Sequence, residues 1–173
     1  MTDGPVLLLL RVVHVLCGVL WVGAAVFLAF YIIPSVREAG PGAAPFMQKL
    51  GARRPPTYML TLAALTVLSG FGLYWRDSSG FQSHEWLRSG SAMVFGVGGV
   101  LGLFVLILGA AVISPAGRRM GDLAAQMQGA GGPPTPELIA EMQALQARLA
   151  RSNTIAAVML IVTTLCMAVA RYV

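Results

Sequence analysis

Four long apolar segments are separated by short stretches rich in proline, glycine and charge. The first is closed by Pro34, the second follows Pro55-Pro56, and the third ends at Ser114-Pro115. Proline lacks a backbone N–H and interrupts a helix, so these positions mark predicted ends. The predicted membrane spans are 6–33, 57–75, 89–113 and 153–172.

The length of these segments predicts helices that cross a membrane. A hydrocarbon core of about 30 Å needs about 20 mostly apolar helical residues. Helices satisfy their own backbone hydrogen bonds in lipid, and four segments are too few for a closed barrel. Of the 173 residues, 57% are hydrophobic and 11% charged, and the mean hydropathy is +0.75. The sequence thus predicts an all-α integral membrane four-helix bundle, with 1–173 forming a single transmembrane domain.

The long third connection has a helical pattern of its own. Thr135-Pro136-Glu137 supplies an N-cap, a proline at the first helical position and an early acidic residue. Apolar residues then recur at spacings of four, three and four: Leu138, Met142, Leu145 and Leu149. With a glycine- and proline-rich turn at 129–134, this predicts a helical hairpin at about 116–152 that extends spans three and four. Its apolar stripes pack on each other or dock a partner helix.

Basic residues near the span ends predict the orientation. Eight lie on the side of the hairpin: Arg37, Lys49, Arg53, Arg54, Arg118, Arg119, Arg148 and Arg151. Four lie on the opposite side: Arg11, Arg76, Arg88 and Arg171. By the positive-inside rule, the hairpin is cytoplasmic and both termini are outside. The aromatic residues agree, with Tyr74, Trp75, Trp86 and Tyr172 at the outer interface and Tyr31 at the inner one.

The same charges bear on location and partners. The net charge is +5, but the basic residues flank apolar runs, which indicates orientation in a lipid bilayer and no nucleic-acid partner. The start of the chain lacks the basic region of a signal peptide, so we expect the first span to be retained. Small size and the use of arginine over lysine suggest a multi-pass protein of the bacterial inner membrane.

One face of the first span carries the candidate chemistry. Spacings of three and four align Arg11, His14, Gly18, Trp21 and Ala25. An imidazole in hydrocarbon needs a hydrogen bond, access to water, or a metal or cofactor, and such groups usually face the bundle interior. His14 is therefore the first candidate site residue, about 10 Å below the outer edge of the span.

The residues around His14 leave several interpretations open. His14 could bond across helices as a packing residue. It could be an axial ligand of haem b, with Gly18 giving a macrocycle room and Trp21 an apolar wall. Paired with Cys17, it could present imidazole and thiolate to copper, or it could handle protons. The other histidine, His84, is expected in a solvated loop near the interface.

Small residues predict how the helices pack. Gly98 and Gly102 form a small-xxx-small pair in the third span, which serves either packing within the chain or contact with another copy or subunit. Further predicted seams are Thr57, Thr61 and Ala64 in span two and Ala156 and Thr163 in span four. The spans hold no acidic residue, and motifs typical of enzymes are absent, so the sequence does not indicate an enzyme.

The run from Leu10 to Gly23, with its His-x6-Trp-x-Gly pattern, resembles the CopD-like superfamily of small four-helix membrane proteins. The end of span two, 68–74, looks similar too. That superfamily includes copper-resistance membrane domains, urate oxidase membrane domains and HemJ-like oxidases. The resemblance implies a membrane redox or metal role, with His14 as the matching histidine and haem b as the cofactor. This chain departs from richer members in having few histidines, no lysine within a span and no soluble cytochrome domain.

Two hypotheses of function follow. In the leading one, a small membrane protein holds haem b or a metal through His14 near the outer leaflet and supports electron transfer. In the alternative, the chain is a non-catalytic accessory subunit of a larger respiratory or photosynthetic membrane complex, assembled through its glycine-rich span and hairpin.

Overall fold

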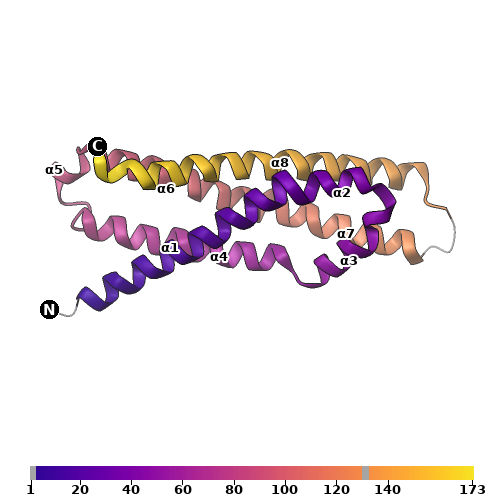
Figure 1. Ribbon diagram of the computed structural model, residues 1–173, viewed down its shortest axis with the longest axis horizontal. Helices are drawn as coiled ribbons and strands as arrows, with labels where there is room; N and C mark the ends of the chain where they lie inside the picture. Colours follow the sequence, from indigo (N-terminus) through magenta and orange to yellow (C-terminus); the bar gives the residue numbers. More distant parts are fainter. Residues whose placement is uncertain (1–2, 130–132) are drawn as a thin grey trace.

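The computed structural model describes residues 3–129 and 133–173, and every secondary-structure element in these ranges is helical. Long helices run side by side along one axis, as Figure 1 shows. The first half of the chain contains α1 (Asp3–Phe27), η1 (Leu28–Ile32), α2 (Ile33–Ala39), η2 (Gly40–Ala43), α3 (Ala44–Ala52) and α4 (Pro55–Asp77). The second half contains α5 (His84–Leu87), α6 (Gly90–Leu108), η3 (Gly109–Ile113), α7 (Ser114–Gly129), α8 (Pro136–Val169) and η4 (Ala170–Tyr172).

Four continuous helical stretches in the described residues are long and apolar enough to cross a membrane. They are Gly4–Ala39, Pro55–Asp77, Gly90–Met127 and Pro136–Tyr172. The prediction of an all-α fold with four helices long and apolar enough to cross a membrane is confirmed for the described residues, and this is the pattern of a multi-pass membrane protein.

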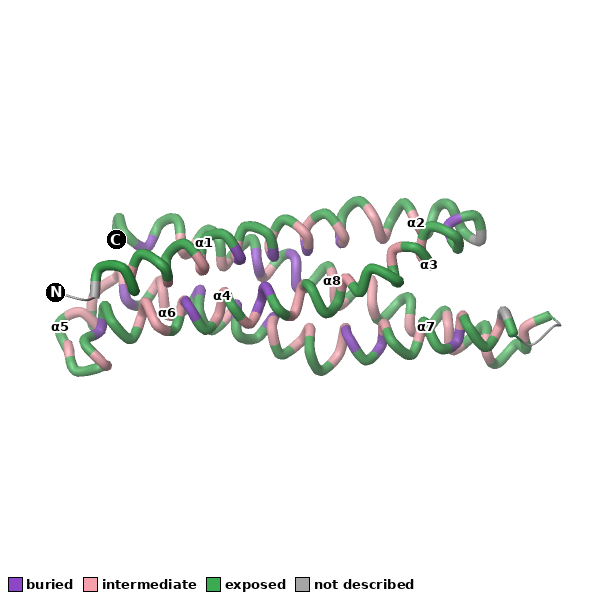
Figure 2. The backbone as a smooth tube through the Cα atoms, turned by 90° about the horizontal axis from the view of Figure 1, so that it is seen from below, coloured by how far each residue is buried: buried purple, intermediate pink, exposed green. Residues whose placement is uncertain are grey.

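The outer surface of the bundle is apolar. Large side chains such as Leu8, Val19 and Leu68 are each more than 60% exposed, and Figure 2 shows exposed residues along the outside of every long helix. A water-soluble protein would not expose so much contiguous apolar surface, whereas a lipid bilayer solvates it. The buried core is a thin central cluster that includes Trp21, Leu62 and Leu160.

Two prolines do not end their helices as predicted. The first helix continues past Pro34 to Ala39, and the third continues past Pro115 to Gly129. In both cases a five-residue π-helical turn, Leu28–Ile32 or Gly109–Ile113, stops two residues before the proline. A π turn widens the helix and displaces the carbonyl that the proline ring would strike, so the chain passes the proline without a break.

The predicted hairpin is present where the structure describes it. α7 packs on α8, and Leu123 of α7 is fully buried between them. The Arg119 guanidinium donates two hydrogen bonds to the Glu141 carboxylate, at 2.7 and 3.1 Å. The Thr135 hydroxyl accepts from the Leu138 N–H, which confirms the N-cap. Of the predicted turn at 129–134, residues 130–132 lie outside the described residues.

The stripe of apolar residues on the first part of α8 is partly buried in this hairpin. Leu138, Met142, Leu145 and Leu149 are all half-covered. This favours packing of the two helices on each other over an open docking surface.

The start of α1, the loop with α5, and the end of α8 lie at one end of the bundle, and the hairpin lies at the other (Figure 1). At the first end, Tyr74 and Trp86 meet edge to face with ring centroids 4.9 Å apart. This is the grouping expected of an interfacial aromatic belt. Which end faces the cytoplasm stays a prediction.

A sharp elbow joins α3 to α4 at the hairpin end. Arg53 and Arg54 bridge the two helices, and Arg54 has left-handed backbone angles of φ 51° and ψ 49°. The Arg54 carbonyl accepts from the N–H groups of Thr57 and Tyr58. Pro55 and Pro56 occupy the first turn of α4, where a missing N–H costs nothing.

Candidate functional site

The candidate site lies where α1 crosses α4. These two helices approach closely because small residues face the partner helix. A Cβ at Gly18 would lie 3.5 Å from the Thr66 methyl group, and one at Gly72 would lie 3.3 Å from a Leu10 methyl group. Such contacts bring the α1 side chains against the α4 backbone.

His14 is joined directly to that backbone. Its Nδ1 lies 2.8 Å from the carbonyl oxygen of Thr66, and the residue is partly buried. The same carbonyl accepts from the hydroxyl of the buried Ser69 at 3.1 Å, and that hydroxyl also reaches the Leu65 carbonyl. A ring nitrogen that would be costly in hydrocarbon is thereby satisfied by a neighbouring helix.

Gly70 makes this contact possible. A Cβ built at Gly70 would lie 2.7 Å from His14 Cε1 and 2.9 Å from His14 Nδ1, closer than real Cβ contacts occur. Because Gly70 stands one helical turn after Thr66, its missing side chain opens the surface of α4 next to the accepting carbonyl. The imidazole ring therefore lies against bare backbone.

The bond fixes the protonation pattern of the ring. A carbonyl oxygen can only accept, so Nδ1 carries the proton and donates it. In the neutral imidazole, Nε2 then keeps its lone pair. Histidines that ligate metals commonly donate the other ring N–H to a backbone carbonyl in this way.

Most of the predicted face of α1 points into the bundle. Trp21 and Ala25 are buried in the central cluster beside Cys17, Gly18 is partly buried, and Arg11 is exposed. The expectation that this face is not lipid-facing is confirmed for Trp21 and Ala25 and wrong for Arg11. Gly18 and Trp21, predicted to frame a cofactor, here pack against Thr66 and within the core.

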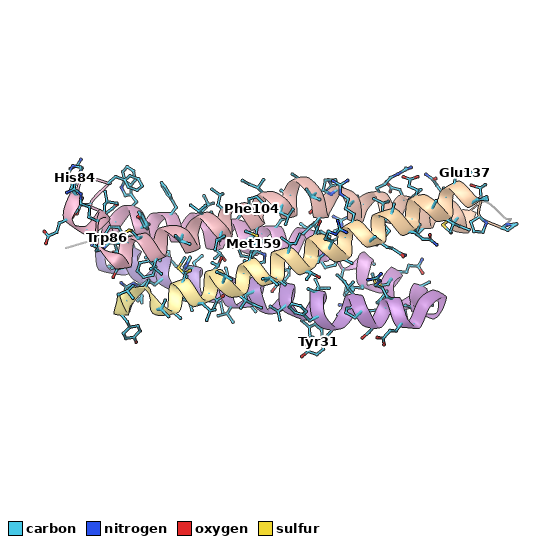
Figure 3. The ribbon with its side chains drawn as sticks, turned by 90° about the horizontal axis from the view of Figure 1, so that it is seen from above. Tyr31, His84, Trp86, Phe104, Glu137 and Met159 are labelled. Atoms are coloured by element: carbon cyan, nitrogen blue, oxygen red, sulfur yellow. The ribbon has the colours of Figure 1, made fainter. Side chains whose placement is uncertain are left out.

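Further metal ligands do not gather around His14. Cys17 is a buried free thiol one turn away, and the described residues contain no cluster of three His, Cys, Asp or Glu side chains able to hold a metal ion. His84 is exposed on α5 and lies at the end of the bundle in Figure 3. The structure brings His14 to Thr66 and Gly70, and it does not bring His84 to His14.

No protein-family model, curated protein or solved structure matches this chain. The resemblance to the CopD-like superfamily therefore stays a prediction that rests on span one and the end of span two.

The glycine pair of the third span is used within the chain. A Cβ at Gly98 would lie 2.9 Å from Met167 Cε and 3.1 Å from Cys166 Cβ of α8, and one at Gly102 would meet the Thr163 methyl group. Both glycines are buried. The structure thus shows the first alternative, packing within the chain against α8, and contact of this face with another copy or subunit stays a prediction.

The predicted seam of span two is also corrected. Thr57 and Thr61 are exposed, and the residues of α4 that are buried are Leu62, Ala63 and Ser69. Sequence reasoning missed Thr66 and Gly70 as partners of His14. The Ser69-Gly70 pair, a small polar residue beside a glycine within an apolar span, is the signal that marks them.

Proposed function

We propose that this chain is a small membrane-embedded protein that binds haem b through His14 and supports electron transfer, with a copper ion as the second choice. The hydrogen bond from His14 Nδ1 to the Thr66 carbonyl carries the proposal. It orients the ring and leaves the lone pair of Nε2 available to coordinate a metal ion.

The residues present fit one axial ligand of a haem better than a closed copper site. For a copper ion, His14 and Cys17 offer one imidazole and one thiolate, and the described residues hold no group of three His, Cys, Asp or Glu side chains that would complete a larger ligand set. A haem can be held by one strong imidazole ligand together with apolar contacts. When bound, haem b supplies reversible one-electron chemistry.

The surrounding side chains have positioning roles in this proposal. The Thr66 carbonyl and Gly70 hold the imidazole plane, while Gly18 lets α1 lie close to Thr66 and Trp21 anchors the same helix in the core. The part of the ring that is not covered by α4 presents Nε2. With both termini outside and the hairpin cytoplasmic, the site lies in the outer leaflet of a bacterial inner membrane.

Haem titration into the detergent-purified protein tests the proposal. We expect a stoichiometric Soret band that His14→Ala abolishes and that Cys17→Ser leaves unchanged. Gly72→Ala is the matched control on α4, because the added Cβ meets the flexible end of Leu10 and not His14. It should keep the band.

Thermal unfolding of the same variants separates ligation from a packing role. If His14→Ala lowers the melting temperature while the natural chain never acquires a Soret band, His14 is a structural link between α1 and α4. If the natural chain binds copper(I) and both His14→Ala and Cys17→Ser lose that binding, the result would support a copper ion as the group held by His14. A colourless protein that co-purifies with large membrane partners would support the accessory-subunit hypothesis.

A further inference from the structure

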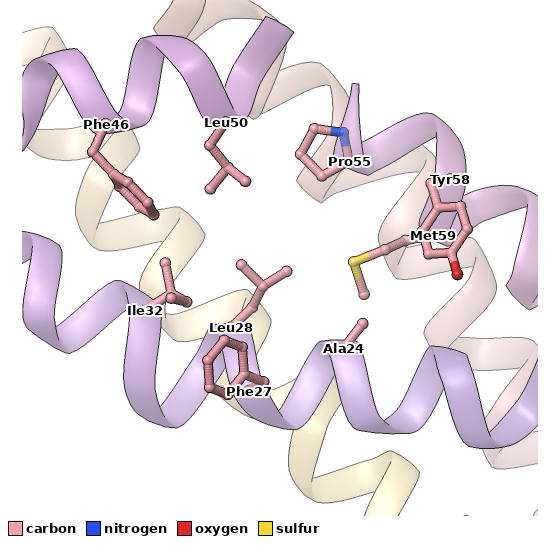
Figure 4. A pocket seen from close by; sticks show the side chains of 9 residues that line it. All are labelled: Ala24, Phe27, Leu28, Ile32, Phe46, Leu50, Pro55, Tyr58 and Met59. Carbon is pink, nitrogen blue, oxygen red and sulfur yellow. The ribbon is translucent and has the colours of Figure 1, made fainter. Parts of the chain in front are cut away.

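A second candidate site lies at the hairpin end of the bundle, away from His14. An apolar cavity of about 300 Å³ opens between α1, η1, α3 and α4. Figure 4 shows side chains from these four elements around it, and its lining includes Ala24, Leu28, Phe46, Leu50, Pro55 and Met59. Its volume is at the lower end of ligand pockets in proteins.

The chemistry of the lining favours a hydrocarbon chain. The lining surface is apolar throughout, and one wall, Leu28 and Ile32, belongs to the π turn in the membrane helix. The opposite wall is α3, a short helix whose Phe46 is half exposed. A flexible chain of methylene groups fits a narrow groove between a membrane helix and a short helix at its end.

The residues beside the cavity carry positive charge. Lys49 precedes the lining residue Leu50, and Arg53 and Arg54 precede the lining residue Pro55. All three are exposed, and none forms an ion pair with another described residue. The chain has no acidic residue between Glu38 and Asp77 to offset them.

The elbow holds these charges close to the opening. The Arg53 N–H donates to the Leu50 carbonyl at 3.1 Å, and the Arg54 N–H donates to the Gly51 carbonyl at 3.0 Å. Arg53 and Arg54 thus lie on a hydrogen-bonded turn between α3 and α4, and Lys49 lies in the last turn of α3. Basic pockets at the membrane ends of helices recognise anionic lipid head groups.

We infer that this elbow binds an anionic glycerophospholipid, with an acyl chain in the apolar cavity and the phosphate group at Lys49, Arg53 and Arg54. This inference does not depend on the proposed function of His14. An anionic glycerophospholipid matches both features, because the cavity accepts hydrocarbon and the basic rim accepts negative charge.

Thermal unfolding of the full chain in mild detergent tests the inference. Phosphatidylglycerol should raise the melting temperature, whereas phosphatidylcholine with the same acyl chains and inorganic phosphate should not. In the triple variant Lys49→Gln, Arg53→Gln, Arg54→Gln, the apparent affinity for phosphatidylglycerol at low ionic strength should fall by at least about tenfold.

Two matched variants keep the experiment decisive. Arg118→Gln, Arg148→Gln, Arg151→Gln removes the same charge from exposed positions on α7 and α8 that do not line the cavity and should keep the preference. Ala24→Leu fills the cavity, leaves the charge intact and should weaken phosphatidylglycerol binding. Equal stabilisation by both lipids, equal losses in both triple variants, or full stabilisation by inorganic phosphate would each overturn the inference.

Discussion

The α1–α4 and α6–α8 contacts both depend on a glycine, but the two glycines accommodate different kinds of side chain. In each, a glycine on one helix admits atoms of the partner. Gly98 of α6 receives Cys166 Cβ and Met167 Cε, which are apolar. Gly70 of α4 receives the imidazole of His14, which is polar and carries a free nitrogen.

The difference separates a glycine that serves packing, Gly98, from one that also positions a polar side chain, Gly70. At Gly98, close approach by itself is the outcome, because packing of small residues drives helix association in lipid. At Gly70, close approach also delivers a hydrogen bond and orients a ring. A small-xxx-small motif is therefore a weak guide to function. The side chain that occupies the space beside the glycine determines whether the contact serves packing alone or also orients a functional group.

The largest effect is expected from Gly70→Ala. The new Cβ strikes an aromatic ring held by a hydrogen bond, so either the ring leaves the Thr66 carbonyl or the helices separate. We expect a loss of about 2–3 kcal/mol in the free energy of unfolding, from overpacking and an unsatisfied polar group. Reversible unfolding in mixed micelles measures it, with Gly72→Ala as the control. A stable Gly70→Ala chain that keeps the bond would remove the distinction between the two contacts.

A smaller effect is expected from Gly98→Ala. The nearest atom, Met167 Cε, is the end of a flexible side chain, but Cys166 Cβ is attached to the backbone and must shift. We expect about 1–2 kcal/mol of destabilisation. Gly99→Ala, whose Cβ meets nothing within 4 Å, should be neutral or slightly stabilising because alanine favours the helix. Neither variant should change a spectrum that depends on His14, and a changed spectrum would argue against separate roles.

The smallest effect is expected outside the core, at the Arg119–Glu141 pair of the hairpin. Both side chains are more than 40% exposed, so their attraction is weakened by solvent and salt. Glu141→Gln should lower the melting temperature slightly at low salt and not at high salt. A large or salt-independent drop would show that a polar contact at the surface matters as much as the one made by His14.

Much of the fold follows from simple patterns. Length and hydropathy predict the four membrane helices, and Thr135-Pro136-Glu137 predicts where α8 begins. The membrane helices and the start of α8 could be predicted because both are determined by residues that are close together in the sequence. The ends of the first and third helices were predicted wrongly, because Pro34 and Pro115 stop a regular α-helix but not one that widens into a π turn first.

For the candidate site, the sequence predicted His14 but not its partners in α4. Periodicity in span one points to His14 and to the buried side of α1. The partners Thr66 and Gly70 lie 52 and 56 positions away in α4, and their alignment with His14 depends on how two helices rotate and cross. Periodicity within one helix does not carry that information. The exposure of Thr57 and Thr61 has the same cause.

The two π turns divide each of their helices into parts with different angular phase. One residue corresponds to about 100° around an α-helix, and a π turn accommodates one extra residue in a single turn. A face traced from His14 to Ala25 therefore does not continue along α2 beyond Ile32. Deleting one residue within 28–32 would restore a regular helix and leave α2, with the α3 elbow that follows it, close to its present direction relative to α1, because the π turn already absorbs the extra residue. A deletion in the regular α-helical stretch between His14 and Leu28 would instead turn the basic end of the molecule by about 100° relative to the His14 contact, so the π turn is the one place in this helix that tolerates the loss of a residue.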